Sequence, residues 1–148
     1  MQKDNYKIFL LMLTLSFIVM HAVMFFNVDA LNHIYLSTTR LYMTLLMVSP
    51  MAVIMLLLMR KHMYQNKRMN VLIVSIASVV FISSLILLRA QEPIGDKQYM
   101  KAMIPHHSSA ILTSQEANLK DPEVKELAQQ IIETQIREIE LMKELLEK

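Results

Sequence analysis

Three long apolar segments constrain the fold of this chain more than any other feature of its sequence. Residues 8–26, 41–59 and 71–88 contain no Asp, Glu, Lys or Arg. At ~1.5 Å per residue, a helix over each segment spans roughly 27–29 Å, close to the ~30 Å hydrocarbon core of a bilayer. A soluble helix would carry a polar face, and these segments have none. The sequence therefore predicts an all-α protein with three transmembrane helices.

Composition excludes several other classes of protein. A single glycine in 148 residues leaves little of the turn chemistry that β-hairpins need. The absence of cysteine excludes disulfides and thiolate zinc sites. A net charge of +2 without basic clustering does not predict nucleic-acid binding. The first segment exceeds the ~7–15 residues of a signal-peptide core and lacks a clear cleavage site, so we interpret it as an uncleaved anchor.

The charges of the short connections predict an orientation. The connection between the second and third segments is basic and contains Arg60, Lys61, His62, Lys67 and Arg68. The first connection, residues 27–40, has only Arg40, which Asp29 offsets. Because positively charged loops stay in the cytoplasm, we expect the second connection and the N-terminus, with Lys3 and Lys7, to lie inside. Everything after residue 88 would then lie on the outer face.

We expect three parts: a membrane domain at 1–89, a linker at 90–95, and a helical hairpin at 96–148. Asp96 is the expected cap of a helix over residues 97–119. The order Asp121-Pro122-Glu123 predicts the start of a final helix that continues to the C-terminus. A hairpin of about fifty residues buries little surface alone. It is therefore expected to dimerise into a four-helix bundle, a homodimer or higher homo-oligomer.

Two stripes of residues are expected to face each other within this hairpin. The stripe on the final helix follows steps of four and three and contains Val124, Ala128, Ile131, Gln135, Glu138, Met142 and Leu145. The matching stripe contains Met100, Met103, His107, Ala110 and Ser114. Antiparallel pairing would place His106 and His107 opposite Gln135 and Glu138, with Met103 and Met142 about one turn further from the connection. Pro105 would either kink the first helix or begin it.

The side chains around His107 suggest a soft metal site. Imidazole and thioether groups suit Cu(I) better than Mg²⁺ or Ca²⁺, which prefer oxygen. The expected metal ligands are His106, His107, Met103, Met142 and Met100. Gln135 and Glu138 would orient the imidazoles through their other nitrogen atoms. The alternative is that the histidines are surface residues and the methionines fill an apolar core.

Three motifs in order carry a resemblance to a known family. They are Met-Ile-Pro-His-His-x-x-Ala-Ile at 103–111, Asp-Pro-Glu-Val at 121–124, and Gln-x-x-Glu-Ile-x-x-Met at 135–142. Over about fifty C-terminal residues the chain resembles a bacterial family catalogued as a domain of unknown function, which includes the copper-binding protein CopM. The resemblance implies a ferritin-like bundle in the periplasm that binds copper without an enzymatic activity, here anchored in the bacterial inner membrane. Family members often carry a methionine after the Ala-Ile pair and two hairpins per chain, and this chain has neither.

Other functions remain open at this point. The hairpin could be an interaction module that docks on a transporter or sensor. A Cu(I) relay across the membrane could use His21 and the methionines that recur every fourth residue from Met43 to Met63. A helix has ~3.6 residues per turn, however, so residues spaced four apart do not stay on one face, and this row of methionines winds around the helix. A di-metal oxidase would need Glu-x-x-His sets, which the chain lacks.

Overall fold

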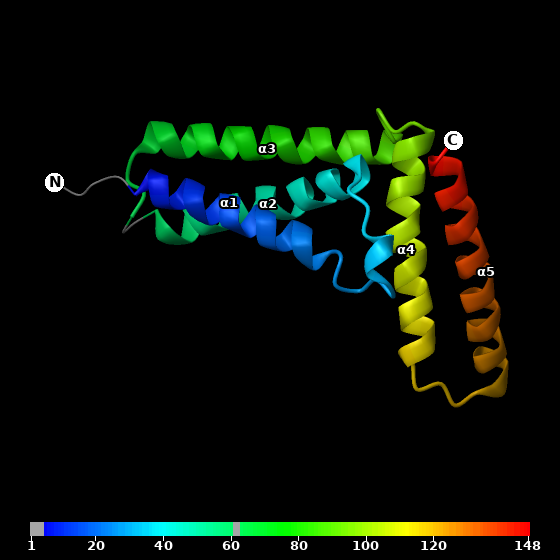
Figure 1. The fold of residues 1–148 in the computed structure, drawn as a ribbon. Coiled ribbons are helices and arrows are strands. Elements are labelled where there is room, and N and C mark those ends of the chain that lie inside the picture. The colour runs from blue at the N-terminus through cyan, green and yellow to red at the C-terminus, as the bar shows by residue number, and fades with distance from the viewer. Residues whose placement is uncertain (1–4, 61–62) are drawn as a thin grey trace. The chain divides into compact units, whose positions relative to one another are not determined.

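The computed structural model describes residues 5–60 and 63–148, and all regular structure in these residues is helical. This confirms the predicted all-α fold. Figure 1 labels the five α-helices, and a short 3₁₀ helix, η1, lies between the first two. The elements are α1 (Tyr6–Val23), η1 (Leu31–His33), α2 (Thr38–Met59), α3 (Lys67–Ala90), α4 (Asp96–Glu116) and α5 (Pro122–Leu146).

The chain forms two compact units, and the connection between α1 and α2 belongs to the second. We call residues 1–23 and 39–93 the three-helix unit, and residues 24–38 and 94–148 the hairpin unit. The sequence-based division into 1–89 and 96–148 did not place residues 24–38 with the hairpin. Because these residues lie far from the hairpin in sequence, only tertiary contacts reveal that they belong to it.

Helices α1, α2 and α3 are long and apolar enough to cross a membrane. They contain 18, 22 and 24 residues, and α1 ends at Val23, three residues before the predicted end at Phe26. Large apolar side chains point outward along all three, including Leu10, Leu58 and Val79, which are 65%, 76% and 66% exposed. So much exposed apolar surface is unusual for a protein in water and is expected of one in lipid.

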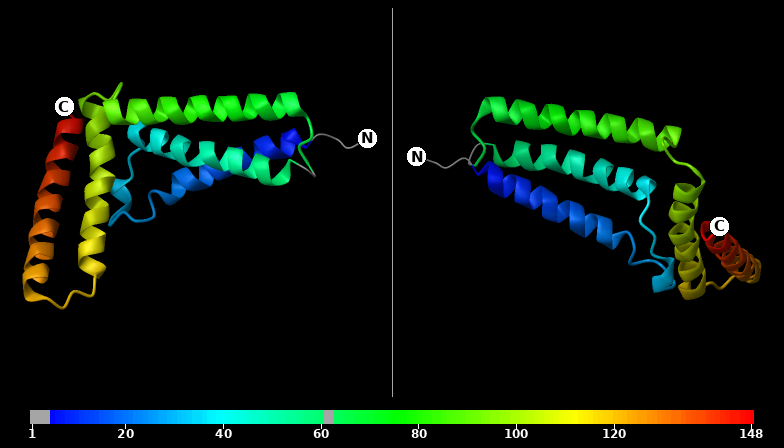
Figure 2. Two further views of the ribbon diagram at one scale, coloured as in Figure 1. Left: turned by 180° about the vertical axis from the view of Figure 1, so that it is seen from behind. Right: turned by 45° about the horizontal axis from the view of Figure 1, so that its top comes forward.

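The core of the three-helix unit is centred on Tyr64, which follows α2 and is fully buried. Its ring lies 5.4 Å from that of Tyr6 and 5.3 Å from that of Phe9, measured between centroids. Tyr6 donates a hydrogen bond of 2.7 Å to Asn70 Oδ1, and Asn70 Nδ2 donates one of 2.8 Å to the Tyr64 carbonyl. These contacts join the start of α1, the residues that follow α2 and the start of α3. Both ribbon views in Figure 2 show the start of α1 near the connection between α2 and α3.

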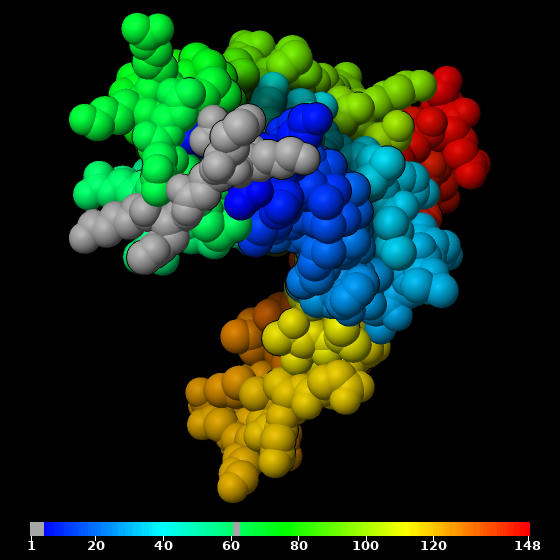
Figure 3. Space-filling view, turned by 90° about the vertical axis from the view of Figure 1, so that its left-hand side faces the viewer, coloured from blue at the N-terminus to red at the C-terminus, as the bar shows by residue number. Residues whose placement is uncertain are grey.

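The basic end of this unit is only partly described. Lys3, Lys61 and His62, on which the predicted orientation partly rests, lie outside the described residues. Arg60, Lys67 and Arg68 are exposed. Figure 3 shows long side chains of the green segment near residue 67 projecting from the surface. The positive charge of this connection is therefore available to solvent or to lipid head groups.

The hairpin unit contains the antiparallel helices α4 and α5, which lie side by side (Figure 1). The predicted cap of α5 is confirmed, because Asp121 accepts hydrogen bonds from the N–H groups of Glu123 (2.8 Å) and Val124 (3.4 Å). The predicted cap of α4 is wrong. Gly95 occupies the cap position without a side-chain bond, and Asp96 lies in the first turn, where its charge still complements the helix dipole.

Helix α4 is continuous through Pro105, which is buried. The alternative in which Pro105 begins the helix is therefore wrong. Proline has no N–H, so the carbonyl of Lys101 loses its usual helical partner at this point. The helix continues to Glu116, three residues short of the predicted end at 119.

Residues 24–38 pack on α4 through a series of hydrogen bonds. Asn27 Nδ2 donates to Ser109 Oγ at 2.7 Å, and the Asp29 N–H donates to Ser108 Oγ at 2.7 Å. The Thr38 N–H donates to Gln98 Oε1 at 3.0 Å. These bonds run along α4 from its first turn to its middle, so α4 is covered by α5 and also by this segment.

Candidate metal site in the hairpin unit

The interface between α4 and α5 is an apolar core with four buried residues: Ile104, Ile111, Ile139 and Met142. Met100 and Met103 are partly buried and pack against it, together with Ile132, Leu146 and Tyr35. All three methionines that were predicted as ligands therefore contribute to apolar packing. This does not exclude ligation, because a thioether can fill a core and bind a soft metal.

The buried stripe of α5 differs from the predicted one by a rotation of the helix. It contains the buried Ile139 and Met142 and the partly buried Ala128, Ile132, Gln135 and Leu146. The predicted Ile131 is partly buried as well. Glu138, which was predicted to be buried, has a side chain that is 47% exposed, whereas Ile139 is 2% exposed. Val124 and Leu145 are exposed too. Burying Ile139 removes apolar surface from water, whereas burying Glu138 would require desolvation of a carboxylate.

The stripe of α4 also needs correction. The almost fully buried residues of α4 are Ile104, Pro105, Ser108 and Ile111, and His107 is partly buried. The predicted Ala110 and Ser114 are likewise only partly buried. The prediction assumed one packing partner for α4. Because the helix is also covered by residues 24–38, its buried surface is wider and centred differently.

The predicted register between the helices is confirmed at His107. Its Nδ1 atom lies 3.6 Å from Glu138 Oε2, and Gln135 Nε2 donates to the same oxygen at 3.5 Å. The separation of 3.6 Å is an ion-pair distance but is too long for a hydrogen bond. Accordingly, His107 Nδ1 and Gln135 Oε1 are buried without a hydrogen-bond partner among the described residues. Two buried polar atoms without hydrogen-bond partners therefore lie beside one carboxylate, and this polar site has unused capacity to bind a further group.

His106 is exposed, in contrast to His107. The two ring centroids are 6.0 Å apart with an interplanar angle of 61°. Consecutive helical residues do not share a face, but residues three and four apart do. Met103 precedes His106 by three positions and His107 by four, so its side chain lies between the two histidines on the helix surface.

The environment of His107 favours a neutral imidazole. Burial lowers its pKa from 6.5, the nearby His106 acts in the same direction, and Glu138 opposes them. A metal ion binds the neutral ring, so no proton has to be displaced at neutral pH. If Nδ1 keeps the proton toward Glu138, the lone pair of Nε2 is free for a ligand.

A third histidine of this unit was not predicted. His33 Nδ1 lies 2.9 Å from Ser108 Oγ, next to His107 in sequence. Burial lowers the pKa of His33 from 6.5, Lys143 lowers it further, and Asp29 partly opposes this. The loop charges predict that residues 27–40 and the hairpin lie on the same side of the membrane. This was the only feature of the sequence that could have suggested a contact between His33 and the hairpin.

Removing the Ser108 hydroxyl should detach residues 24–38 from α4. In Ser108→Ala, the Asp29 N–H loses its acceptor and His33 loses its partner, at a cost of about 1–3 kcal/mol for groups left unsatisfied. We expect faster hydrogen–deuterium exchange in residues 24–38, measured by mass spectrometry. Ser109→Ala is the matched control and should have a smaller effect, because its partner Asn27 is exposed. Equal exchange in the two variants would contradict the assignment.

Acidification should loosen the hairpin unit. The folded pKa values of His33 and His107 lie below 6.5, so below about pH 6.5 the unfolded state binds more protons than the folded state. Stability is therefore fully present above pH 6.5 and falls as the pH decreases toward the lowered pKa values. Exchange rates in residues 24–38, corrected for intrinsic pH dependence, should rise between pH 7 and pH 5. His33→Gln should reduce this rise, and an unchanged rise would count against His33.

Acidic and histidine side chains alone do not form a metal site here. Among the described residues, no group of three or more His, Asp or Glu side chains could hold a metal ion. The methionines of α2 do not form a single row either. Met43 and Met47 are exposed, whereas Met55 and Met59 pack against the Tyr64 core. His21 Nδ1 lies 2.8 Å from Thr44 Oγ1, and the His21 ring stacks on the ring of Phe17.

Comparison with known proteins places this arrangement in a family. The family described as a domain of unknown function, DUF305, matches residues 55–146. The chain belongs to the DUF305 family. The matched region begins within α2 and includes α3, so it is longer than the fifty residues over which we noted the resemblance. The family likeness therefore extends from the hairpin into the segments that could cross a membrane.

One relative resembles almost the entire chain. It is an uncharacterized protein of Acanthamoeba polyphaga mimivirus, 37% identical over 146 residues, which cover 97% of this chain and 93% of the viral protein. No solved structure gives a significant match. The similarity is thus not restricted to the hairpin, and the relative is viral rather than bacterial.

Proposed function

We propose that this protein is a membrane-anchored metal-binding protein that sequesters or hands off Cu(I) at the surface of its hairpin unit. The observation that carries the proposal is the polar site at His107. There Nδ1 of the partly buried His107 lies 3.6 Å from Glu138 Oε2, the His106 ring lies 6.0 Å away between centroids, and Met103 precedes His107 by one helical turn. The residues fit a soft ion, because the only sulfur in this chain is thioether sulfur and the imidazoles supply borderline nitrogen.

Each candidate residue has a role in this proposal. His107 and His106 would bind the ion through ring nitrogens, and Met103 would supply sulfur from the adjacent turn. Met142 and Met100 lie in the same apolar cluster and would complete the coordination when the ion enters. Gln135 and Glu138 would orient His107 through Nδ1.

A competition titration tests this proposal. The full chain is purified in detergent and titrated with Cu(I) against a chromogenic Cu(I) chelator, beside His106→Ala/His107→Ala and beside His21→Ala. The full chain is needed because residues 24–38 belong to the hairpin unit. We expect the double variant to lose measurable binding and His21→Ala to retain it. Equal affinity of wild type and double variant would refute the hairpin site, and loss only in His21→Ala would favour the transport alternative.

Exchanging the thioethers for leucine separates ligation from packing. Met103→Leu/Met142→Leu keeps the apolar volume, so stability should change by less than about 1.5 kcal/mol. We expect Cu(I) affinity to fall roughly tenfold or more, because each lost ligand weakens a soft site. Met47→Leu/Met69→Leu, which lies outside the hairpin unit, is the control and should bind as wild type. Unchanged affinity in the first variant would assign the methionines to packing alone.

The exposed face of α5 supports pairing with a second copy. Val124, Leu127, Leu141 and Leu145 are between 41% and 55% exposed, and their separations of 3, 14 and 4 positions place them on one face of the helix. We propose that two hairpins pair through this face into a four-helix bundle. Leu127→Glu/Leu141→Glu should then dissociate the dimer, as measured by light scattering of the detergent-solubilised protein. If wild type is monomeric at all accessible concentrations, the same face instead supports the interaction-module alternative.

For the location, we propose that the basic connection between α2 and α3 lies in the cytoplasm and that the hairpin faces outward. Arg60, Lys67 and Arg68 support this orientation by their charge. Placement in a bacterial inner membrane, like the copper-binding role of CopM-like proteins, remains an expectation from the family resemblance.

A further inference from the structure

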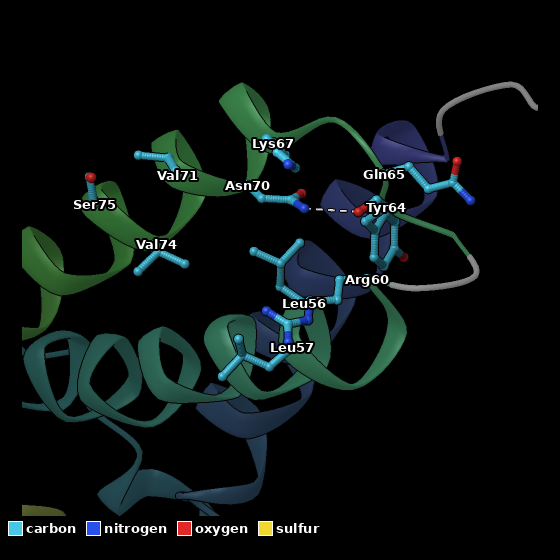
Figure 4. A pocket seen from close by; sticks show the side chains of 10 residues that line it. All are labelled: Leu56, Leu57, Arg60, Tyr64, Gln65, Lys67, Asn70, Val71, Val74 and Ser75. Carbon is cyan, nitrogen blue, oxygen red and sulfur yellow. Dashed lines mark hydrogen bonds between the residues drawn. The ribbon is translucent and has the colours of Figure 1, made fainter.

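A cavity of about 680 Å³ opens in the three-helix unit where α2 and α3 are connected. This volume falls within the ~300–1,000 Å³ of typical ligand sites. Figure 4 shows the lining, which is provided by the end of α2, the residues after it and the first turns of α3. The lining residues are Leu56, Leu57, Arg60, Tyr64, Gln65, Lys67, Asn70, Val71, Val74 and Ser75.

The lining combines positive charge with an apolar wall. Among the described residues 5–60 and 63–148, Arg60 and Lys67 are the charged residues of the lining, and none of the described lining residues is acidic. In Figure 4 the Arg60 side chain extends back toward Leu57, and Lys67 lies at the start of α3. Leu57, Val71 and Val74 continue the wall along the two helices. An occupant that matches this lining has an anionic head and a hydrocarbon chain.

Tyr64 is the aromatic residue of the lining. It is fully buried and lines the cavity, and its hydroxyl has no hydrogen-bond partner among the described residues. Because this hydroxyl is closed off from solvent, it is not counted as a donor to an occupant of the open cavity. The positive end of the α3 dipole adds to the same preference for an anion.

We propose that this cavity binds an anionic phospholipid. Arg60 and Lys67 contact the phosphate, and the first part of one acyl chain lies against Leu57, Val71 and Val74. Both cations lie at the ends of helices that are long and apolar enough to cross a membrane. The ends of such helices lie at the depth of the lipid head groups. A free phosphate ion would satisfy the cations but would leave the apolar wall without a partner. The proposal is independent of the metal site.

Lipid binding can be measured on the full chain. The detergent-purified protein is titrated with phosphatidylglycerol and, separately, with phosphatidylcholine, and bound lipid is counted by native mass spectrometry. We expect phosphatidylglycerol to bind roughly tenfold more tightly, because its phosphate charge is not cancelled by a choline. Millimolar inorganic phosphate should not displace it. Equal affinity for the two lipids, or displacement by phosphate, would overturn the proposal.

Matched variants test the two halves of the cavity. Arg60→Gln/Lys67→Gln should abolish the preference for phosphatidylglycerol, whereas Arg68→Gln/Arg89→Gln removes the same charge outside the lining and should retain it. Ser75→Phe should fill the apolar part and weaken binding, and Ser83→Phe, on the same helix but outside the lining, should not. Equal losses in either matched pair would indicate nonspecific adsorption and would refute the site. Circular dichroism confirms that each variant keeps its helix content.

Discussion

His107→Ala should lower the affinity of the full chain for Cu(I) by about a hundredfold, whereas His106→Ala should lower it much less. His107 is partly buried and lies 3.6 Å from Glu138, so its ring is held in one orientation. His106 is exposed and, without such a contact, must lose more conformational freedom on binding. Competition titration of the two single variants at pH 7 measures the difference.

The control for this comparison is Glu138→Gln. This variant retains a hydrogen-bond acceptor toward His107 Nδ1 but removes the carboxylate charge, so Cu(I) affinity should fall moderately, between the values for the two alanine variants. If His106→Ala proves more damaging than His107→Ala, the polar site between α4 and α5 is not the centre of metal binding. The ion would then be bound at the outer surface of α4.

Ile139→Ala should destabilise the hairpin unit by about 2–5 kcal/mol, the usual cost of truncating a buried isoleucine. Ile139 is 2% exposed in the cluster with Ile104 and Ile111. Glu138→Ala should change stability by less than about 1 kcal/mol, because its side chain is 47% exposed and its ion pair with His107 is loose. Hydrogen–deuterium exchange of the backbone amides in α4 and α5 measures the change in stability of the hairpin unit in both variants.

These adjacent substitutions distinguish the two possible stripes of α5. The sequence-based stripe includes Glu138 and does not include Ile139, so it predicts the reverse order of effects. A larger loss for Glu138→Ala would therefore restore the original stripe and contradict the packing of the hairpin unit. Ile136→Ala, at an exposed position of the same helix outside the proposed pairing face, serves as a control for loss of an apolar side chain.

Much of the fold follows from local sequence. The three apolar segments predict helices that are found at 6–23, 38–59 and 67–90. The Asp-Pro-Glu signal at residue 121 predicts the start of α5. Each signal acts within a few residues, through hydrogen bonds to the first turn or through exclusion of charge from a span. Neighbouring elements are not needed to interpret them.

The candidate site was predictable only in part. The pairing of His107 with Glu138 follows from hairpin length and antiparallel direction, and the structure confirms it. The buried stripe did not follow, because two stripes with steps of three and four share Ala128, Gln135 and Met142. Both stripes are therefore compatible with the spacing of residues in the sequence. Only the cost of burying Glu138 instead of Ile139 against α4 decides between them.

The sequence by itself determined that the chain is helical, that three of its helices suit a membrane, and that histidine and methionine side chains recur together in the hairpin. Tertiary structure alone decided that residues 24–38 join the hairpin through His33 and Ser108, which are 75 positions apart. It also decided that Arg60, Lys67 and Tyr64 line one cavity. The physical reason is that helix periodicity reports which residues share a face, whereas the partner of that face depends on long-range packing and on which groups can be desolvated at least cost.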